Sequence, residues 1–174
     1  MVKHHESWHS ENGSGGTKGK DSGEKILQFH AKMKNEFVTW LGKQTPPMTD
    51  LLDKNGLLPT WDTTQPLPKE FWSGCSNHSI DWKTPAFLTN TADASQQLKL
   101  DGRTITCLSD IKSPDELGRV WGKSGAHAIA HIRLGDEMSG FASVRDPAFM
   151  LWHFGVLENI RADWLKTDSG KTRT

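Results

Sequence analysis

The chain has 174 residues, of which 34% are hydrophobic and 24% charged, with 21 basic residues balancing 21 acidic ones. This length suits a single domain, and the balanced charge excludes a protein that binds nucleic acid through a basic surface. No apolar run approaches the roughly 20 residues that cross a bilayer, so we expect no membrane partner. The first residues lack an apolar signal core, so the default expectation is a cytoplasmic location. The N-terminus of the sequence can be incomplete.

The first 42 residues predict two helices joined by a loop. Residues 1–9 have a helical pattern, and residues 10–23 are rich in Gly, Ser and Lys, which is typical of a flexible loop. Ser22 is placed to cap a second helix that ends near Gly42. Its apolar positions recur three or four residues apart, which indicates an amphipathic helix. They are Ile26, Leu27, Phe29, Met33, Phe37 and Leu41.

The middle of the chain favours irregular structure. Residues 43–95 hold six of the eight prolines, so we expect a long coil with a short helical turn around 48–53. Residues 97–107 alternate around Asp101-Gly102, which predicts a short β-hairpin. Cys75 and Cys107 are too few for a disulfide framework and would form a lasting disulfide only in an exported protein.

Helical signals return after the hairpin. Ser113, Pro114 and Glu116 combine an N-cap, a proline at the first helical position and a glutamate three residues after the cap. Another helix is expected over 125–134, followed by a loop over 135–145. Asp146-Pro147 then begins a last helix that runs to about residue 166, and the polar tail 167–174 is expected to be disordered. The fold is therefore predicted to be mainly α, with residues 1–166 as one domain.

The eight histidines contain a repeated pattern. His5 and His9 are four residues apart, and 20 residues separate His9 from His30. His127 and His131 are likewise four apart, with 21 residues between His131 and His153. Residues four apart lie on one face of a helix, so both imidazoles of a pair can reach one metal ion. A third histidine from a partner helix would complete each site, and two such sites favour a four-helix bundle with a metal pair in its core.

Other interpretations of these histidines remain open at this stage. Three imidazoles suit copper, zinc, iron or nickel, and the lack of a carboxylate at ligand spacing disfavours a two-histidine, one-carboxylate iron site. Histidines near the start of a chain can come from an expression tag, and a single pair four apart is common on ordinary helices. His4 competes with His5, but only His5 has the spacing to His9. His78 fits neither pattern and is interpreted as a loop histidine.

The sequence resembles the type-3 dicopper family of tyrosinases, catechol oxidases, phenoloxidases and haemocyanins. The second half carries the clearer match, through Glu116-Leu-Gly118, His127-Ala-Ile-Ala-His131, Gly135, Met138 and residues 143–153. Arg145-Asp-Pro147, Phe149 and Trp152-His153 are most similar to the arthropod version. The first half matches through His5-Glu-Ser-Trp-His9, Gly23-Glu24, Leu27, Phe29-His30 and Met33. The matching spans, 5–33 and 116–153, cover 67 residues, and the Pro-rich middle shows no match.

The resemblance implies a four-helix core that holds two copper ions, with the long coil and the hairpin between the helix pairs. One ion would be bound by His5, His9 and His30, and the other by His127, His131 and His153. It further implies an oxidase that uses O2 to convert diphenols or aminophenols to quinone-type products, and a possible copper-loading partner. Phe29 and Phe149 are expected near the ions, and Asp146 is expected to cap the last helix and to help orient the second site.

Departures from the family pattern limit this expectation. Hydroxylating members commonly have Asn where this chain has Ala128, which disfavours hydroxylation of monophenols. The Arg or Asn that often follows the second histidine in the family is Ile132 here. The family also has an aspartate in the last helix, and the nearest acidic residue here, Glu158, is one position away from it. No side-chain base is evident beyond Glu116 and Asp136, which are candidates by position only. Two alternatives remain. The first is a non-catalytic relative that binds O2 or copper, in which residues 135–144 or the Pro-rich middle block the approach of a substrate. The second is a dizinc hydrolase.

Overall fold

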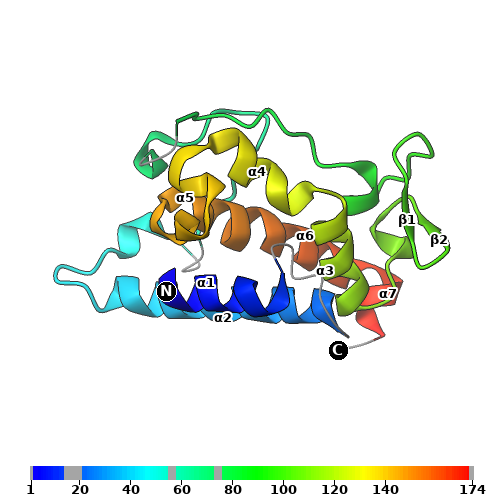
Figure 1. Ribbon diagram of the computed structural model, residues 1–174, viewed down its shortest axis with the longest axis horizontal. Helices are drawn as coiled ribbons and strands as arrows, with labels where there is room; N and C mark the ends of the chain where they lie inside the picture. Colours follow the sequence, from blue (N-terminus) through cyan, green and yellow to red (C-terminus); the bar gives the residue numbers. More distant parts are fainter. Residues whose placement is uncertain (1, 14–20, 55–57, 73–75, 173–174) are drawn as a thin grey trace.

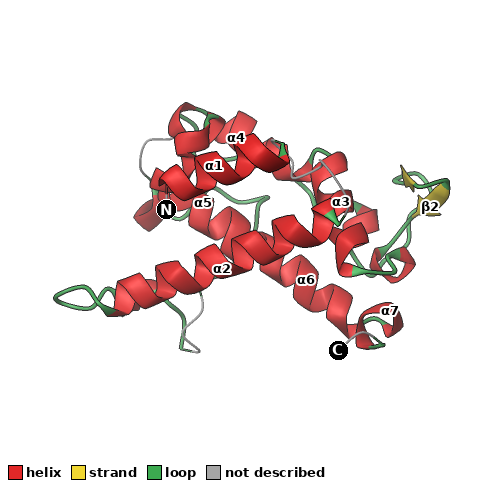
Figure 2. Cartoon of the chain, turned by 60° about the horizontal axis from the view of Figure 1, so that its bottom comes forward, coloured by secondary structure: helices red, strands yellow, loops and turns green. Residues whose placement is uncertain are grey.

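The computed structural model describes residues 2–13, 21–54, 58–72 and 76–172. This part of the chain is mainly helical and contains a two-stranded antiparallel sheet, as the sequence predicted (Figures 1 and 2). The α-helices are α1 (Val2–Asn12), α2 (Ser22–Gly42), α3 (Pro114–Lys123), α4 (Ala126–Leu134), α5 (Pro147–Met150), α6 (Leu157–Lys166) and α7 (Asp168–Lys171). Across the described ranges, none of the helices combines the length and the apolarity that crossing a membrane requires.

A π-helical turn, η7 (Leu151–Val156), joins α5 to α6, so the backbone is helical from Pro147 to Lys166. This agrees with the single last helix expected from the sequence, except that the wider π turn was not foreseen. Its six residues are all buried, and they include His153. A π turn inside a helix often occurs at a functional site.

Two of the predicted helix starts are confirmed by their caps. Ser113 Oγ accepts a hydrogen bond from the Glu116 amide at 3.1 Å, with Pro114 next to it at the first helical position. Asp146 Oδ1 accepts from the Ala148 amide at 2.9 Å and begins α5. These side chains satisfy amide donors that a helix N-terminus leaves unpaired.

The start of α2 differs from the expectation. Ser22 is the first residue of the helix and is buried, and the cap position is taken by Asp21, whose φ is +57°. Asp21 makes no side-chain capping bond with the described part of the helix. A neighbouring helix supplies the acceptor instead, because the Gly23 amide donates to Asp115 Oδ1 of α3 at 2.9 Å.

Helices α2 and α3 come into backbone contact at a pair of glycines. A methyl group placed on Gly118 would overlap the backbone of Gly23, and one on Gly23 would overlap the Asp115 carbonyl and the Arg119 amide. Both helices therefore need glycine at this crossing. The contact holds the start of α2 beside α3, and α2 then carries its buried face, which includes Ile26, Phe29, His30 and Met33, into the core.

The proline-rich middle is irregular, as expected, and contains the short 3-10 turns η1 (Thr49–Leu51), η2 (Lys69–Phe71) and η3 (Ala86–Leu88). Backbone hydrogen bonds hold part of it against the end of α4, since the Asn77 amide donates to the Leu134 carbonyl at 3.0 Å. Arg133 Nη1 donates to the Ile80 carbonyl at 2.6 Å. In Figure 1 this green segment runs along the outer side of α4.

The hairpin is present where the sequence predicted it. Strands β1 (Leu98–Leu100) and β2 (Arg103–Ile105) pair with Leu100 opposite Arg103, and Asp101 and Gly102 form the turn with positive φ angles. Three further 3-10 turns, η4 (Leu108–Asp110), η5 (Asp136–Ser139) and η6 (Phe141–Arg145), complete the described elements. Cys107 has a free thiol, and Cys75 lies outside the described residues.

The C-terminal tail is more ordered than predicted. Thr167 caps α7, because its Oγ1 accepts a hydrogen bond from the Gly170 amide at 3.2 Å. Gly170 is buried against the end of α6, where a methyl group would overlap the Trp164 carbonyl. The prediction of disorder failed over residues 167–172 because a polar composition conceals this cap and this glycine contact.

Candidate metal centre

The structure brings the six histidines singled out by their spacing into one cluster. His5 and His9 come from α1, His30 from α2, His127 and His131 from α4, and His153 from the π turn η7. Five of them are at most 5% exposed, and His131 is partly exposed. His4, the competitor of His5, is exposed. His78 stacks on Trp72 with ring centroids 3.9 Å apart, in the coil.

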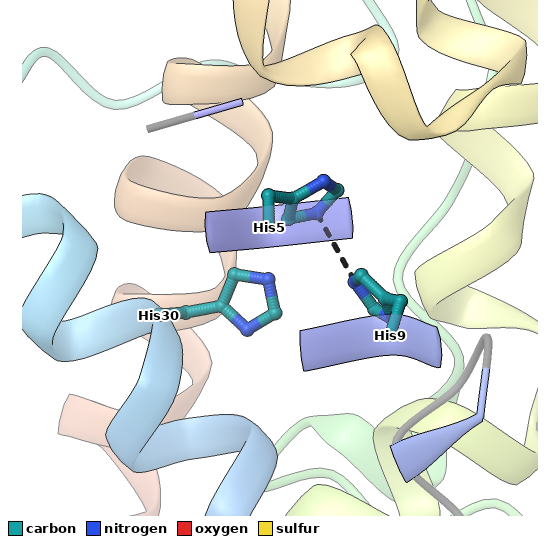
Figure 3. A group of neighbouring side chains, drawn as sticks. All are labelled: His5, His9 and His30. Carbon is teal, nitrogen blue, oxygen red and sulfur yellow. Dashed lines mark hydrogen bonds between the residues drawn. The ribbon is translucent and has the colours of Figure 1, made fainter. Parts of the chain in front are cut away.

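The first group consists of His5, His9 and His30, as expected from the sequence (Figure 3). One nitrogen from each ring lies within 4.8 Å of the others, which is close enough for one metal ion to bind all three. The Nε2 atoms of His5 and His9 are 3.1 Å apart, because one helical turn places the two rings side by side. His30 approaches the pair from α2.

The second group differs in part from the expected one. The nitrogens that lie within 4.8 Å of one another belong to His30, His127 and His153, so His30 takes part in both groups. His131 remains next to this group, with its Nε2 3.3 Å from His153 Nε2. The two groups meet because the His30 and His153 rings stack with centroids 4.6 Å apart.

Backbone carbonyls orient four of the six rings. In each, Nδ1 lies at hydrogen-bond distance from a carbonyl oxygen, which can only accept, so Nδ1 carries the proton and Nε2 keeps its lone pair. This is the arrangement that metal-binding histidines usually have. The pairs are His9 with Gly13 at 3.2 Å, His30 with Ile26 at 2.8 Å, His131 with Met138 at 2.7 Å and His153 with Phe149 at 3.0 Å.

The Nε2 lone pairs created in this way face one another. His131 and His153 both donate from Nδ1, so their Nε2 atoms, 3.3 Å apart, are both acceptors while the rings are neutral. His30 Nε2 is buried, and no described residue forms a hydrogen bond with it. His127 Nε2 lies 3.0 Å from His153 Nε2 and can donate to it in one tautomer, but the contact between His131 and His153 still joins two acceptors. Acceptors that face each other in this way are unfavourable by themselves and favourable around a cation. The residues present therefore fit a metal ion.

Burial keeps these imidazoles neutral. It lowers the pKa of His30 to about 3 and that of His131 to about 4, against the effect of their hydrogen bonds to carbonyl groups. Burial also places the pKa values of His127 and His153 well below the ordinary value, and it lowers that of His9. A neutral imidazole is the form that binds metal, so the cluster is ready for an ion at neutral pH.

The geometry also indicates how two ions could share the cluster. His30 donates its Nδ1 proton to Ile26 and has one lone pair left, so it can bind only one ion. An ion held by His5, His9 and His30 leaves His127, His131 and His153 for a second ion. The six-ligand assignment made from the sequence stays a prediction. The described part of the chain contributes no Asp or Glu to either group.

Aromatic rings surround the cluster. Phe149 stacks on His153 with centroids 3.9 Å apart and contacts His5 at 5.1 Å. Phe29 lies 6.2 Å from His5 and stacks on Trp8 at 4.5 Å, which holds α1 against α2. Both phenylalanines were expected near the ions, whereas the Trp8 contact and the carbonyl acceptors were not, because they depend on tertiary contacts rather than on spacing.

A cavity of about 370 Å³ borders the cluster. Four of the histidines line it, together with Ala128, Ile132, Ser139, Ser143 and two glycines. Small-molecule sites usually have roughly 300–1,000 Å³, so the volume suits a small ligand. The possible bases are placed elsewhere: Glu116 accepts hydrogen bonds from Arg103 and from the Lys112 amide, and the exposed Asp136 is not part of the lining.

Asp146 and Glu158 have structural partners in this structure. Asp146 caps α5, and burial raises the pKa of its carboxyl group. Glu158 forms an ion pair with Lys34 at 3.1 Å, which ties α6 to α2. Neither carboxylate belongs to a histidine group.

Comparison with known proteins adds no family assignment: no protein-family model, no curated protein and no solved structure matches this chain.

Proposed function

We propose that this protein is a binuclear copper oxidase that uses O2 to oxidise diphenols or aminophenols to quinone-type products. The observation that carries the proposal is a largely buried, carboxylate-free histidine cluster in the described part of the chain. In it the Nε2 acceptors of His131 and His153 face each other, and the described residues offer His30 Nε2 no hydrogen-bond partner. The resemblance of the two histidine motifs to the type-3 dicopper family favours copper over zinc. The four histidine-bearing helices would then form the core around the two ions.

When bound, copper would supply the redox chemistry, and the protein would supply position and shape. Carbonyl acceptors hold the rings of His30, His131 and His153 in one tautomer, so their lone pairs need no reorganisation. Phe149 covers His153 and excludes water from that side. The cavity admits a phenyl-sized molecule to the face formed by His5, His9, His127 and His131.

The cavity lining favours diphenols over monophenols. Ala128 and Ile132, at the two positions where relatives often have polar side chains, both line the cavity. Among the described lining residues there is no carboxylate or amide to take a proton from a monophenol. Ser139 and Ser143 offer hydroxyl groups that can hold a second phenolic oxygen.

The test is to load the protein anaerobically with Cu(I), admit O2 and record the near-ultraviolet spectrum, the copper content and catechol turnover. We expect two coppers per chain, a strong charge-transfer band and catechol oxidation. His30→Ala should abolish the band, because it removes a ligand of one ion and the band requires both ions. His4→Ala, a change on the exposed side of α1 next to His5, is the matched control and should retain it.

Each contrary outcome identifies an alternative. A band without catechol turnover would indicate a non-catalytic relative that binds O2. Retention of zinc in preference to copper, with no redox activity, would indicate the dizinc hydrolase. Failure to bind any of these metals would overturn the proposal altogether.

A further inference from the structure

Tryptophans form a connected cluster beside the histidines. Trp152 lies 5.1 Å from Trp82 and 5.1 Å from Trp121, measured between ring centroids, and Trp82 and Trp121 are 6.3 Å apart. Aromatic rings at these separations are in contact. We call Trp82, Trp121 and Trp152 the tryptophan triad. Trp61 joins its edge, 6.4 Å from Trp152.

One end of the triad meets the candidate metal centre. Trp152 precedes His153, and its Nε1 donates to the His127 carbonyl at 3.2 Å, so it is linked to a histidine of α4 as well as to the π turn. Trp121 lies 6.4 Å from the His127 ring. Trp121 and Trp152 are fully buried.

The other end reaches the surface. Trp82 is partly exposed and lies on the coil, where its backbone is fixed to Thr63 by two hydrogen bonds, of 2.6 and 3.3 Å. The rings therefore form a continuous path of indoles from the histidines to solvent. Indole is among the most easily oxidised side chains in proteins, and the composition includes eight Trp and no Tyr.

We propose that the tryptophan triad carries electrons from the protein surface to the histidine centre. The inference rests on the proposed function for the source of the oxidant, and on the ring contacts for the path. It assigns Trp82 as the entry point and Trp152 as the residue that delivers the electron. When no diphenol is bound, electrons from the surface would pass along this path and reduce the oxidised centre.

The electron balance is simple. Trp152 loses one electron to the oxidised centre and becomes a cation radical, which keeps its N–H because its acceptor is a neutral carbonyl. Trp82 then reduces Trp152, and a soluble one-electron donor of the thiolate or ascorbate class reduces Trp82. Among the residues that the structure describes, the Trp121 Nε1–H has no hydrogen-bond partner. Trp121 would therefore pass the charge on as a cation, because no described group accepts its proton.

A metal-free experiment tests the path separately from the proposed function. The metal-free protein is irradiated with a soluble ruthenium(II) tris-bipyridine complex and persulfate, which takes an electron from the excited complex and generates ruthenium(III) as the one-electron oxidant. Oxidised tryptophans are then mapped by peptide mass spectrometry. We expect Trp152 and Trp121 to be oxidised at least fivefold more than Trp164. Trp164 is equally buried, and no aromatic contact with it is found in the described part of the chain.

Two variants sharpen this test. Trp82→Phe should remove most of the oxidation of Trp152 and Trp121, because it removes the entry point. Trp40→Phe, a change of a more exposed tryptophan outside the triad, should not. Equal oxidation of Trp152 and Trp164, or no effect of Trp82→Phe, would overturn the path whatever the metal content of the protein.

A second experiment connects the path to the centre. The copper-loaded protein is incubated with O2 and a limiting amount of ascorbate, and oxidised residues are mapped again. We expect Trp82 to be oxidised more than the more exposed Trp40, and Trp152→Phe to reduce the oxidation of Trp82 at least threefold. Oxidation of Trp40 and Trp82 in proportion to exposure would show diffusing oxidants and refute the link to the centre. A protein that binds no copper but passes the metal-free test would refute only the proposed function.

Discussion

The histidine cluster should make the metal-free protein sensitive to mild acid. An imidazole that is neutral in the folded state and protonated in the unfolded state lowers the free energy of unfolding as the pH falls below about 6.5. The loss continues until the pH reaches the pKa of the folded state, which for His30 is about 3. Stability is therefore complete near pH 7 and decreases progressively through pH 6, 5 and 4.

The magnitude follows from the size of the pKa shifts. Well below pH 6.5, each such histidine contributes a slope of about 1.4 kcal/mol per pH unit, which amounts to about 2 kcal/mol between pH 7 and pH 5. Burial also lowers the pKa values of His127 and His153, so both act in the same direction as His30. His30 and His131, with folded-state pKa values of about 3 and about 4, would together remove about 4 kcal/mol, which is a large part of the stability of a typical domain.

The assay is urea unfolding of the metal-free protein at several pH values between 7 and 4.5. His30→Leu should reduce the slope of unfolding free energy against pH by about 1.4 kcal/mol per unit. Met33→Ala is the matched control, since it removes a buried side chain from the same helix without removing a titrating group. Stability that stays constant from pH 7 to 5, or an unchanged slope in His30→Leu, would refute the reasoning.

Three further changes test other parts of the structure. Gly118→Ala should lower the free energy of unfolding in urea by about 1–3 kcal/mol, because its methyl group meets the backbone of α2, while Gly42→Ala, at an uncrowded position, should not. Trp8→Ala should weaken copper binding at the first group about tenfold in a chelator competition, because it removes the stack that holds α1 on α2. Ile132→Ser should raise KM for catechol without changing copper content, because this side chain lines the cavity and is 72% exposed; an unchanged KM would contradict the assigned substrate approach.

Local signals in the sequence predicted local structure well. Ser113-Pro114 and Asp146-Pro147 start helices because a side-chain acceptor and a preset φ act within a few residues. Asp101-Gly102 makes the hairpin turn for the same kind of reason. Ser22 failed as a cap because the acceptor for this helix start comes from Asp115, which is 92 residues away from Gly23 in the chain.

The histidine cluster shows which part of a metal site spacing can predict. A separation of four residues on a helix places two rings together, and this identified His5 rather than His4 without any structure. Spacing does not determine how two helix pairs approach each other. The role of His30 in both groups, and the position of His131 at the edge of the second, come from the crossing of α2 with η7, where the His30 and His153 rings stack.

The choice of tautomer is the step that turns a cluster of histidines into a candidate centre. It depends on the carbonyls of Gly13, Ile26, Met138 and Phe149, and a backbone carbonyl has no signature in the sequence. Those of Ile26 and Phe149 come from the preceding turn of the same helical segment, so a third histidine deep inside a helix can be oriented by its own backbone. That of Met138 requires the loop after α4 to fold back onto His131. Residues 135–145 therefore contribute to the centre in two ways. They fix a proton on His131 Nδ1, and some of them line the cavity.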